Sequence, residues 1–382
     1  MANDIVLIDQ PDALAKACAQ LQDAEWLALD TEFLRERTYY PRLCLVQIAV
    51  PGHIFCIDPL AVPDLGPLFE LLFREDLLKV VHSGRQDFEI FHHLAGRVPA
   101  PVFDTQLAAP LLGYGDQIGY GNLVRERLGV QLGKAHTRTD WSQRPLSGDQ
   151  IRYAADDVRY LAELFPAMRQ ALAERGRLDW LAEDFARLTH PETYANPPES
   201  AWRRIKAAQR MKGGSLAVLQ ALAAWRESEA QRSDRPRKWV LSDEVIETLA
   251  RMKPHSRKEL KRVRGLNDAQ IERLGDTLLA IIGEARERAP EPLDRGERPR
   301  PLTTAEEALV DVLTGVVRLL AAQADLHPSV LTGRKGLEAL VRGERAGPLF
   351  EGWRAQAVGR PLLDILEGRR SLQVGPEGLE LG

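Results

Sequence analysis

The stretch WLALDTEF, residues 26–33, places two acids, Asp30 and Glu32, directly after an apolar run. The apolar residues predict a strand over residues 26–29, and side chains two positions apart on a strand project to the same face. A single acid at the end of a strand often caps a helix or begins a turn. Two acids on one face also suit a cation site. The stretch therefore predicts a buried strand that ends in a pair of carboxylates.

The apolar runs that follow predict a domain of the α/β class. Pro51 and Gly52 form a turn signal between two β-like runs, so the first three strands are expected to make an antiparallel meander. Shorter β-like runs then alternate with helical ones, which is typical of layered strands and helices. The expected strands cover residues 26–29, 43–50, 54–57, 78–81 and 102–103, and the expected helices cover residues 64–73, 86–94 and 105–112.

From residue 147 onward the sequence predicts helices. Ser147 and Gln150 form a capping box ahead of apolar residues that recur at the helical period. Proline-rich stretches without periodicity predict linkers at residues 190–198 and 289–301. The last stretch, SLQVGPEGLELG, residues 371–382, is expected to fray.

Two further acidic clusters lie farther along the chain. Asp87 falls in the first turn of the helix expected at residues 86–94, where an acid also suits the helix dipole. Tyr153 and Asp157 are four residues apart and are therefore neighbours on one helix face. A helical tyrosine is more often a packing residue than a site residue, and none of the clusters is decisive by itself.

Together, the clusters predict a nuclease site that uses metal ions. Carboxylates gathered on an apolar scaffold repel one another unless cations lie between them, and oxygen ligands suit hard divalent ions. Two such ions suit the cleavage of a phosphodiester bond. The Tyr153 hydroxyl is expected to orient the attacking water, because a phenol with a pKa of about 10 is a poor base. The expected metal ligands are Asp30, Glu32, Asp87 and Asp157, and with Tyr153 they form the expected catalytic set.

The charge distribution favours an anionic partner. The net charge is −4, yet residues 201–264 hold 17 Lys/Arg against 7 Asp/Glu. Arginine, which makes up most of the basic residues, binds phosphate through paired hydrogen bonds, although a solvated helical surface explains the same counts. No apolar run is long enough to span a membrane, the start MANDIVLIDQ does not resemble a signal peptide, and the three cysteines lack zinc spacing. A cytoplasmic protein is expected.

Long motifs in roughly the first 200 residues resemble the DEDD exonuclease superfamily, its tyrosine subtype, and within it the bacterial ribonuclease D family. In the tyrosine subtype, three residues separate Tyr from Asp, and Tyr153 and Asp157 match that spacing. The histidine subtype has His instead of Tyr and one more intervening residue. The motifs are DTEF at 30–33, RTYYPRLCLVQIA at 37–49, HSGRQDFEIF at 82–91, FDTQLAA at 103–109 and YAADDVRYL at 153–161.

The resemblance implies an α/β RNase H-like exonuclease domain, a mixed sheet flanked by helices, over residues 1–200. It implies two all-α HRDC-like domains after it, at residues 205–290 and 300–375, the second expected by position more than by motif. The first is supported by LAAWRESEAQRSDRPRKWVLSDEVI and KRVRGLNDAQIERLGDTLLAII. The implied activity is 3'-to-5' release of 5'-mononucleotides from RNA, in the maturation of tRNA 3' ends. The implied cofactors are two divalent ions per site, Mg²⁺ or Mn²⁺.

Residues beside the acids are candidates for contact with the substrate. The rings of Phe33, Tyr39 and Tyr40 suit stacking on bases, although ordinary packing explains them equally well. Gln47 projects from the second strand. His82 ends the strand at residues 78–81, where a structural role is favoured over a site role.

The expected partners are tRNA precursors and other structured RNA 3' ends, without a membrane, and a monomer is favoured. Two alternatives stay open. The first is a DNA 3'-to-5' exonuclease, because the metal chemistry does not need the 2'-hydroxyl group. The second is a degenerate RNA-binding scaffold, against which the presence of all four acids argues.

Overall fold

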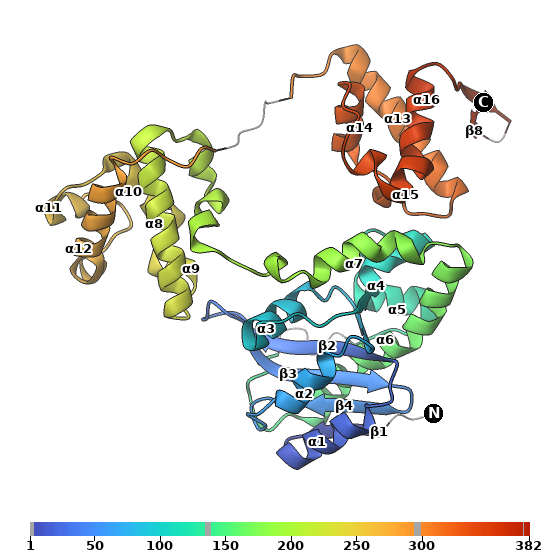
Figure 1. Ribbon diagram of the computed structural model, residues 1–382, viewed down its shortest axis with the longest axis horizontal. Helices are drawn as coiled ribbons and strands as arrows, with labels where there is room; N and C mark the ends of the chain where they lie inside the picture. The colour runs from blue at the N-terminus through green and yellow to red at the C-terminus, as the bar shows by residue number, and fades with distance from the viewer. Residues whose placement is uncertain (1–3, 134–138, 294–298, 377) are drawn as a thin grey trace. The chain divides into compact units, whose positions relative to one another are not determined.

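The computed structural model describes residues 4–133, 139–293, 299–376 and 378–382 (Figure 1). The chain forms two compact units. The first contains Met1–Glu32, Leu43–Thr193 and Arg300–Gly382, and the second contains Phe33–Arg42 and Tyr194–Pro299. The middle of the linker expected at residues 289–301, residues 294–298, lies outside the described residues.

A six-stranded mixed sheet lies at the centre of the first unit and confirms the α/β prediction. Its strand order is β1-β4-β3-β2-β5-β6, so β2, β3 and β4 are consecutive neighbours, as expected for a meander. β3 and β4 pair antiparallel, whereas β1–β4, β2–β5 and β5–β6 pair parallel. The strands are β1 (Asp4–Ile8), β2 (Trp26–Leu34), β3 (Arg42–Val50), β4 (His53–Ile57), β5 (Leu78–Val81) and β6 (Val102–Asp104).

The first strand and the first helix were not predicted. β1 is an edge strand, and only its Ile8 is fully buried. Because the strand has no continuous buried face, its sequence DIVLI lacks the alternation of apolar and polar residues that would predict it. α1 (Pro11–Gln20) begins with proline in its first turn, which suits a helix start, and packs against α2 (Gly66–Leu72). The remaining helices of this part are α3 (Arg85–Ala95), α4 (Thr105–Ala108) and α5 (Tyr120–Leu128).

The long helix α6 (Gly148–Glu174) packs against β1, β4 and β5, and carries the third acidic cluster. Its start confirms the predicted capping box. The Ser147 side chain accepts a hydrogen bond from the Gln150 backbone, and the Gln150 side chain accepts one from the Ser147 backbone. Among the described residues, no helix has both the length and the apolar character needed to cross a membrane.

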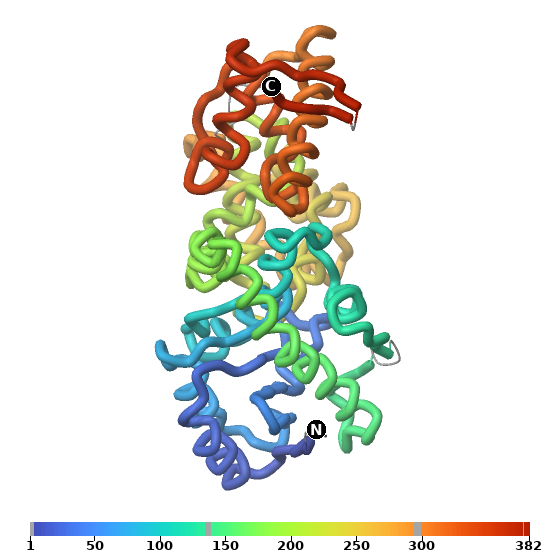
Figure 2. The backbone as a smooth tube through the Cα atoms, turned by 90° about the vertical axis from the view of Figure 1, so that its right-hand side faces the viewer, coloured from blue at the N-terminus to red at the C-terminus, as the bar shows by residue number. Residues whose placement is uncertain are grey.

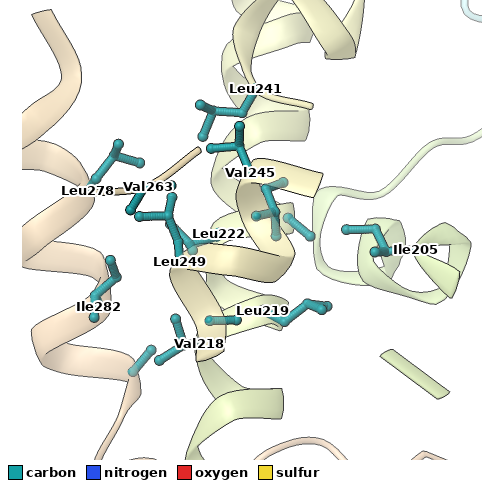
Figure 3. Packing of buried hydrophobic residues seen from close by; sticks show 14 of the residues in the cluster. Ile205, Val218, Leu219, Leu222, Leu241, Val245, Leu249, Val263, Leu278 and Ile282 are labelled. Atoms are coloured by element: carbon teal, nitrogen blue, oxygen red, sulfur yellow. The ribbon is translucent and has the colours of Figure 1, made fainter. Parts of the chain in front are cut away.

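The second unit is a helical domain with its own apolar core. Figure 3 shows this core: Leu222 of α8 (Gly213–Arg232) lies among residues from the other helices, including Leu249 and Leu278. Burying leucine and isoleucine side chains stabilises the fold by about 1.5–3 kcal/mol each. The other helices are α9 (Arg237–Val240), α10 (Asp243–Met252), α11 (Arg257–Leu260) and α12 (Asp268–Ala285).

The C-terminal segment belongs to the first unit. Asp325 of this segment forms an ion pair with Arg175 at 2.8 Å. The backbone N–H of His327 donates a hydrogen bond to the Pro110 carbonyl at 2.9 Å. Trp353 stacks on Trp180, with ring centroids 4.3 Å apart. The main helices of the segment are α13 (Thr304–Gln323), α14 (Arg334–Val341) and α16 (Arg360–Leu366).

The chain ends in a hairpin, which the sequence did not predict. β7 (Leu372–Gly375) and β8 (Gly378–Leu381) pair antiparallel, and Figure 2 shows them in red near the C-terminus. The expectation that the last twelve residues fray, and that this last part is entirely helical, is therefore wrong. The reason is local: Leu372 pairs with Leu381 and Val374 with Leu379, so each strand is the partner of the other.

Candidate active site

β2 carries Asp30 and Glu32 into the middle of the first unit, between β3 and β5. The ring of Trp26, at the start of β2, lies 4.9 Å from the ring of Phe165 on α6. Trp26, Asp30 and Glu32 alternate onto the same face of the strand, so α6 covers the face that presents the two acids. The same helix carries Tyr153 and Asp157.

The third acid comes from the turn between β5 and α3. Asp104 accepts hydrogen bonds from the backbone N–H groups of Ser83 and Gly84, both at 3.0 Å, and so holds this turn. Only glycine fits at position 84, because a Cβ atom there would lie 2.6 Å from the Val81 side chain. Asp87 follows in the first turn of α3, where it is 7% exposed and accepts a hydrogen bond from the Thr31 hydroxyl.

The four acids lie within electrostatic reach of one another. Burial raises the pKa of Asp30 well above its usual range, and the charges of Asp87, Asp157 and Glu32 raise it further. Burial, with the charges of Asp157 and Asp87, raises the pKa of Glu32 to about 8. Burial is also the main cause that raises the pKa of Asp87 to about 6 and that of Asp157 to about 7. The sheet and two helices thus bring together residues that are far apart in the sequence.

The donor set fits divalent cations, although the side chains do not already form a cage. Among the residues that the structure describes, no three His, Cys, Asp or Glu side chains are grouped as metal ligands. Four buried or half-buried carboxylates that oppose one another's ionisation need positive charge before all of them can ionise. Carboxylate oxygens are the ligands that Mg²⁺ and Mn²⁺ prefer, so the chemistry of the donors matches these ions.

A pocket of about 370 Å³ opens beside Asp157, between α5 and α6, and the Tyr153 side chain lines it. The Tyr153 ring also lies 6.1 Å from the ring of Trp141. Asn122 and Arg125 on α5 also line it and add polar and positively charged groups. A pocket lined by both acids and a guanidinium group suits a nucleotide, whose phosphate can bind the guanidinium.

Tyr120 also lies at this pocket, although the sequence alone does not indicate it. It lines the same pocket, and its hydroxyl donates to the backbone carbonyl of Asp156 at 2.9 Å. Burial, followed by the charges of Asp157 and Asp30, raises its pKa well above the usual range. Nothing in its local sequence, QIGYGN, distinguishes it from a packing aromatic.

Two of the five candidate substrate contacts, His82 and Gln47, have side chains that are bonded or buried within the protein. His82 has hydrogen-bond partners for both ring nitrogens, the Thr105 hydroxyl at 2.9 Å and the Ile118 carbonyl at 3.1 Å, which is the structural role that was favoured. Gln47 is completely buried, and its amide group has no hydrogen-bond partner among the described residues. In this conformation neither side chain is available to a nucleotide.

The other three candidates fall in the segment Phe33–Arg42, which is part of the second unit: Phe33 is near the end of β2, and Tyr39 and Tyr40 lie in the loop between β2 and β3. Tyr39 is only 6% exposed and packs with Ala230 and Val240 of the helical domain. Phe33 and Tyr40 are half-buried. The ring of Tyr39 is therefore occupied by packing rather than open for stacking on a base.

Comparisons with known proteins agree with this arrangement. The family model for 3'-5' exonucleases matches residues 5–173, and the model for the HRDC domain matches residues 215–282. Ribonuclease D of Sphingobium indicum is 41% identical, with 96% of each chain covered, and that of Zymomonas mobilis is 39% identical, with 96% of this chain and 95% of the other covered.

A solved structure gives the same result. The crystal structure of Escherichia coli RNase D, an exoribonuclease involved in structured RNA processing, superimposes with a TM-score of 0.79 at 30% identity and covers 96% of this chain and 99% of that one. The exonuclease domain is therefore followed by one HRDC domain that a family model identifies. The chain belongs to the ribonuclease D family, and it is a 3'-to-5' exoribonuclease that acts on RNA and depends on divalent metal ions.

Proposed function

We propose that the protein trims the 3' ends of structured RNA, tRNA precursors above all, and releases 5'-mononucleotides with the help of two divalent ions, Mg²⁺ or Mn²⁺. The observation that carries the proposal is that β2, α3 and α6 bring four acids together: burial, and then the charges of Asp87 and Asp157, raise the pKa of both Asp30 and Glu32. Neighbouring carboxylates disfavour one another's ionised form, and bound cations remove this repulsion, so such a cluster suits shared cations.

Each residue of the site has its own role in this proposal. Asp30, Glu32, Asp87 and Asp157 hold the ions, which when bound favour ionisation of water and offset charge on the phosphate and on the departing 3' oxygen. The Tyr153 hydroxyl donates a hydrogen bond that orients the attacking water toward the phosphorus. Arg125, which lines the same pocket as Asp157, binds a phosphate of the substrate.

The proposal also assigns the parts of the chain. Residues 1–200 form the exonuclease domain, 205–290 the HRDC domain and 300–375 a second, divergent HRDC-like domain. The protein acts as a monomer in the cytoplasm, where its RNA substrates are found. The basic residues between positions 201 and 264 support a role of the HRDC domain in holding RNA phosphates.

One assay tests the proposal. Purified protein with Mg²⁺ is given a tRNA with a 3' extension or a single-stranded DNA of matched length, and the products are resolved by length. We expect mononucleotides and a stepwise shortening of the RNA, with slower turnover of the DNA. Preferred digestion of DNA would favour the alternative of a DNA exonuclease, and binding of RNA without any product would favour a degenerate scaffold.

A further inference from the structure

The loop between β2 and β3 is anchored in the helical domain through the hydroxyl of Tyr39. This hydroxyl donates to the Glu227 carboxylate and accepts from the Arg237 guanidinium at 2.8 Å and from the Gln231 amide at 3.2 Å. The Arg237 guanidinium also lies over the Tyr39 ring, 4.6 Å from its centre. Three residues of α8 and α9 therefore hold one tyrosine by its hydroxyl and its ring.

The backbone of the loop is fixed to the same domain. Asp234, between α8 and α9, accepts hydrogen bonds from the backbone N–H groups of Tyr39 and Tyr40, both at 3.0 Å. The contacts therefore determine the path of the chain here as well as the position of one side chain. The whole segment Phe33–Arg42 is part of the helical unit rather than of the sheet unit.

The partner of Tyr39 is a buried charge pair, which makes the anchor rigid. Glu227 is 0% exposed, and Arg237 binds it through two hydrogen bonds at 2.5 and 2.6 Å. Although burial raises the pKa of Glu227, the hydrogen bonds from Arg237 and Tyr39 lower it below its usual range. A buried, ionised acid must keep its partners, so the geometry around the Tyr39 hydroxyl is narrowly defined.

The anchored loop follows the catalytic strand, which ends at Leu34, two residues after Glu32. The boundary between the two units falls between Glu32 and Phe33, so the end of β2 already belongs to the helical unit. The chain between Glu32 and the anchor at Tyr39 is short. Restricting the loop at Tyr39 therefore restricts the backbone conformations open to Glu32, and a small displacement at a catalytic centre has a large effect on rate.

We propose that Tyr39 is a positioning residue, through which the helical domain sets the loop that follows β2 and thereby the placement of Glu32. The inference rests on the proposed function, because it assigns Glu32 a role in holding the cations. It gives the HRDC domain a part in the chemical step in addition to any contact with RNA.

The test uses the full chain with Tyr39→Phe, which removes the hydroxyl and keeps the ring that packs with Ala230 and Val240. We expect faster hydrogen–deuterium exchange of the loop amides, weaker Mn²⁺ binding by calorimetry, and a kcat on a short unstructured RNA lower by about tenfold at unchanged KM. Glu227→Gln, which weakens the same anchor from the other side, should give the same pattern. Exchange of the α12 amides shows whether each variant keeps the fold of the helical domain.

Glu229→Gln is the matched control, because Glu229 is on the same helix but pairs with exposed Arg232, at 2.8 Å. It should change none of the three measurements. Faster loop exchange in Tyr39→Phe with unchanged kcat and Mn²⁺ affinity would overturn the inference, and so would unchanged exchange. If the wild type released no mononucleotides, the proposed function would fail, while loop exchange and Mn²⁺ affinity would still decide the role of Tyr39.

Discussion

The ring of Phe165 on α6 lies 4.9 Å from the ring of Trp26 on β2, and this contact sets the register between the helix and the catalytic strand. A strand rises about 3.3 Å per residue and a helix about 1.5 Å, so four strand residues span nearly the same distance as eight helix residues. Asp157 is eight residues before Phe165, and Asp30 is four residues after Trp26. The two acids therefore lie at the same level, which explains why the charge of Asp157 adds to the effect of burial in raising the pKa of Asp30.

Asp30→Asn should abolish cleavage while leaving the fold intact. The change removes the charge of the acid whose pKa is raised by burial and then by the other three acids, and preserves its shape. We expect turnover with Mg²⁺ to fall by on the order of 10³-fold, since one group that stabilises transition-state charge is lost. Asp149→Asn is the control, because Asp149 lies exposed in the first turn of α6. Near wild-type turnover of a folded Asp30→Asn protein would remove Asp30 from the site.

Tyr153→Phe should lose activity and keep its affinity for metal. The hydroxyl is assigned to positioning of water rather than to metal ligation, and the loss of one positioning hydrogen bond costs on the order of 10²-fold in rate. Single-turnover rates and calorimetric Mn²⁺ binding measure the two effects separately. An unchanged rate would show that Tyr153 only packs against Trp141 and lines the pocket.

Tyr120→Phe should separate a structural tyrosine from a catalytic one. Its hydroxyl bonds to the Asp156 backbone carbonyl, which links the start of α5 to α6. Loss of that bond should lower the free energy of unfolding by about 1 kcal/mol. The rate should fall less than in Tyr153→Phe. Chemical denaturation and single-turnover rates of both variants test this order, and a larger rate loss in Tyr120→Phe would reverse the two roles.

The sequence predicted well those parts of the fold that have strong local signals. The strands at β3 and β5 and the cap at Ser147 follow from apolar runs and a capping box, and the structure has them within a residue or two. The edge strand β1 and the terminal hairpin were missed because neither has a buried face with clear alternation. In both, pairing with a neighbouring strand decides the structure more than local composition does.

For the site, the sequence showed which residue types were present but not what surrounds them. The acids stand out because charge is rare on buried strands and helices. Tyr39 looked equally suited to stacking and to packing, and its partner Glu227 is 188 residues away, so only the tertiary structure reveals the anchor. The Arg144–Asp58 ion pair, at 2.5 Å, likewise joins two segments that are distant in the sequence. Arg144 lies just before α6, so the pair fixes the chain where this helix begins.

The stability of the metal-free protein should fall as the pH rises through the range of the site acids. The pKa is raised to about 6 at Asp87, about 7 at Asp157 and about 8 at Glu32, so the folded state favours the protonated forms. This contribution to stability is complete below the pKa of the unfolded chain, about 4, is lost progressively above it, and is gone above about pH 8. Bound Mg²⁺ should offset the loss, and metal affinity should rise over the same range.

Glu32→Gln tests this pH dependence, because glutamine resembles the protonated acid. Without metal, the variant should melt at a higher temperature than the wild type at about pH 8.5, above the raised pKa, and at nearly the same temperature at about pH 4, below the pKa of the unfolded chain. With excess Mg²⁺ the advantage at high pH should disappear. Equal melting temperatures at high pH without metal would mean that the pKa of Glu32 is not raised in the folded protein.

Arg262→Ala and Arg264→Ala should weaken the binding of tRNA and flatten its dependence on salt. Both side chains are exposed on the HRDC domain, within the basic segment of residues 201–264. Each phosphate contact that is lost should lower the slope of log affinity against log salt by about 0.7–0.9. Arg232→Ala is the control, because Glu229 already neutralises that charge at 2.8 Å. Turnover of a short RNA should change little in all three variants, since the acids and Tyr153 are untouched. If the double variant binds tRNA with the affinity and salt slope of the wild type, these two arginines are not phosphate contacts.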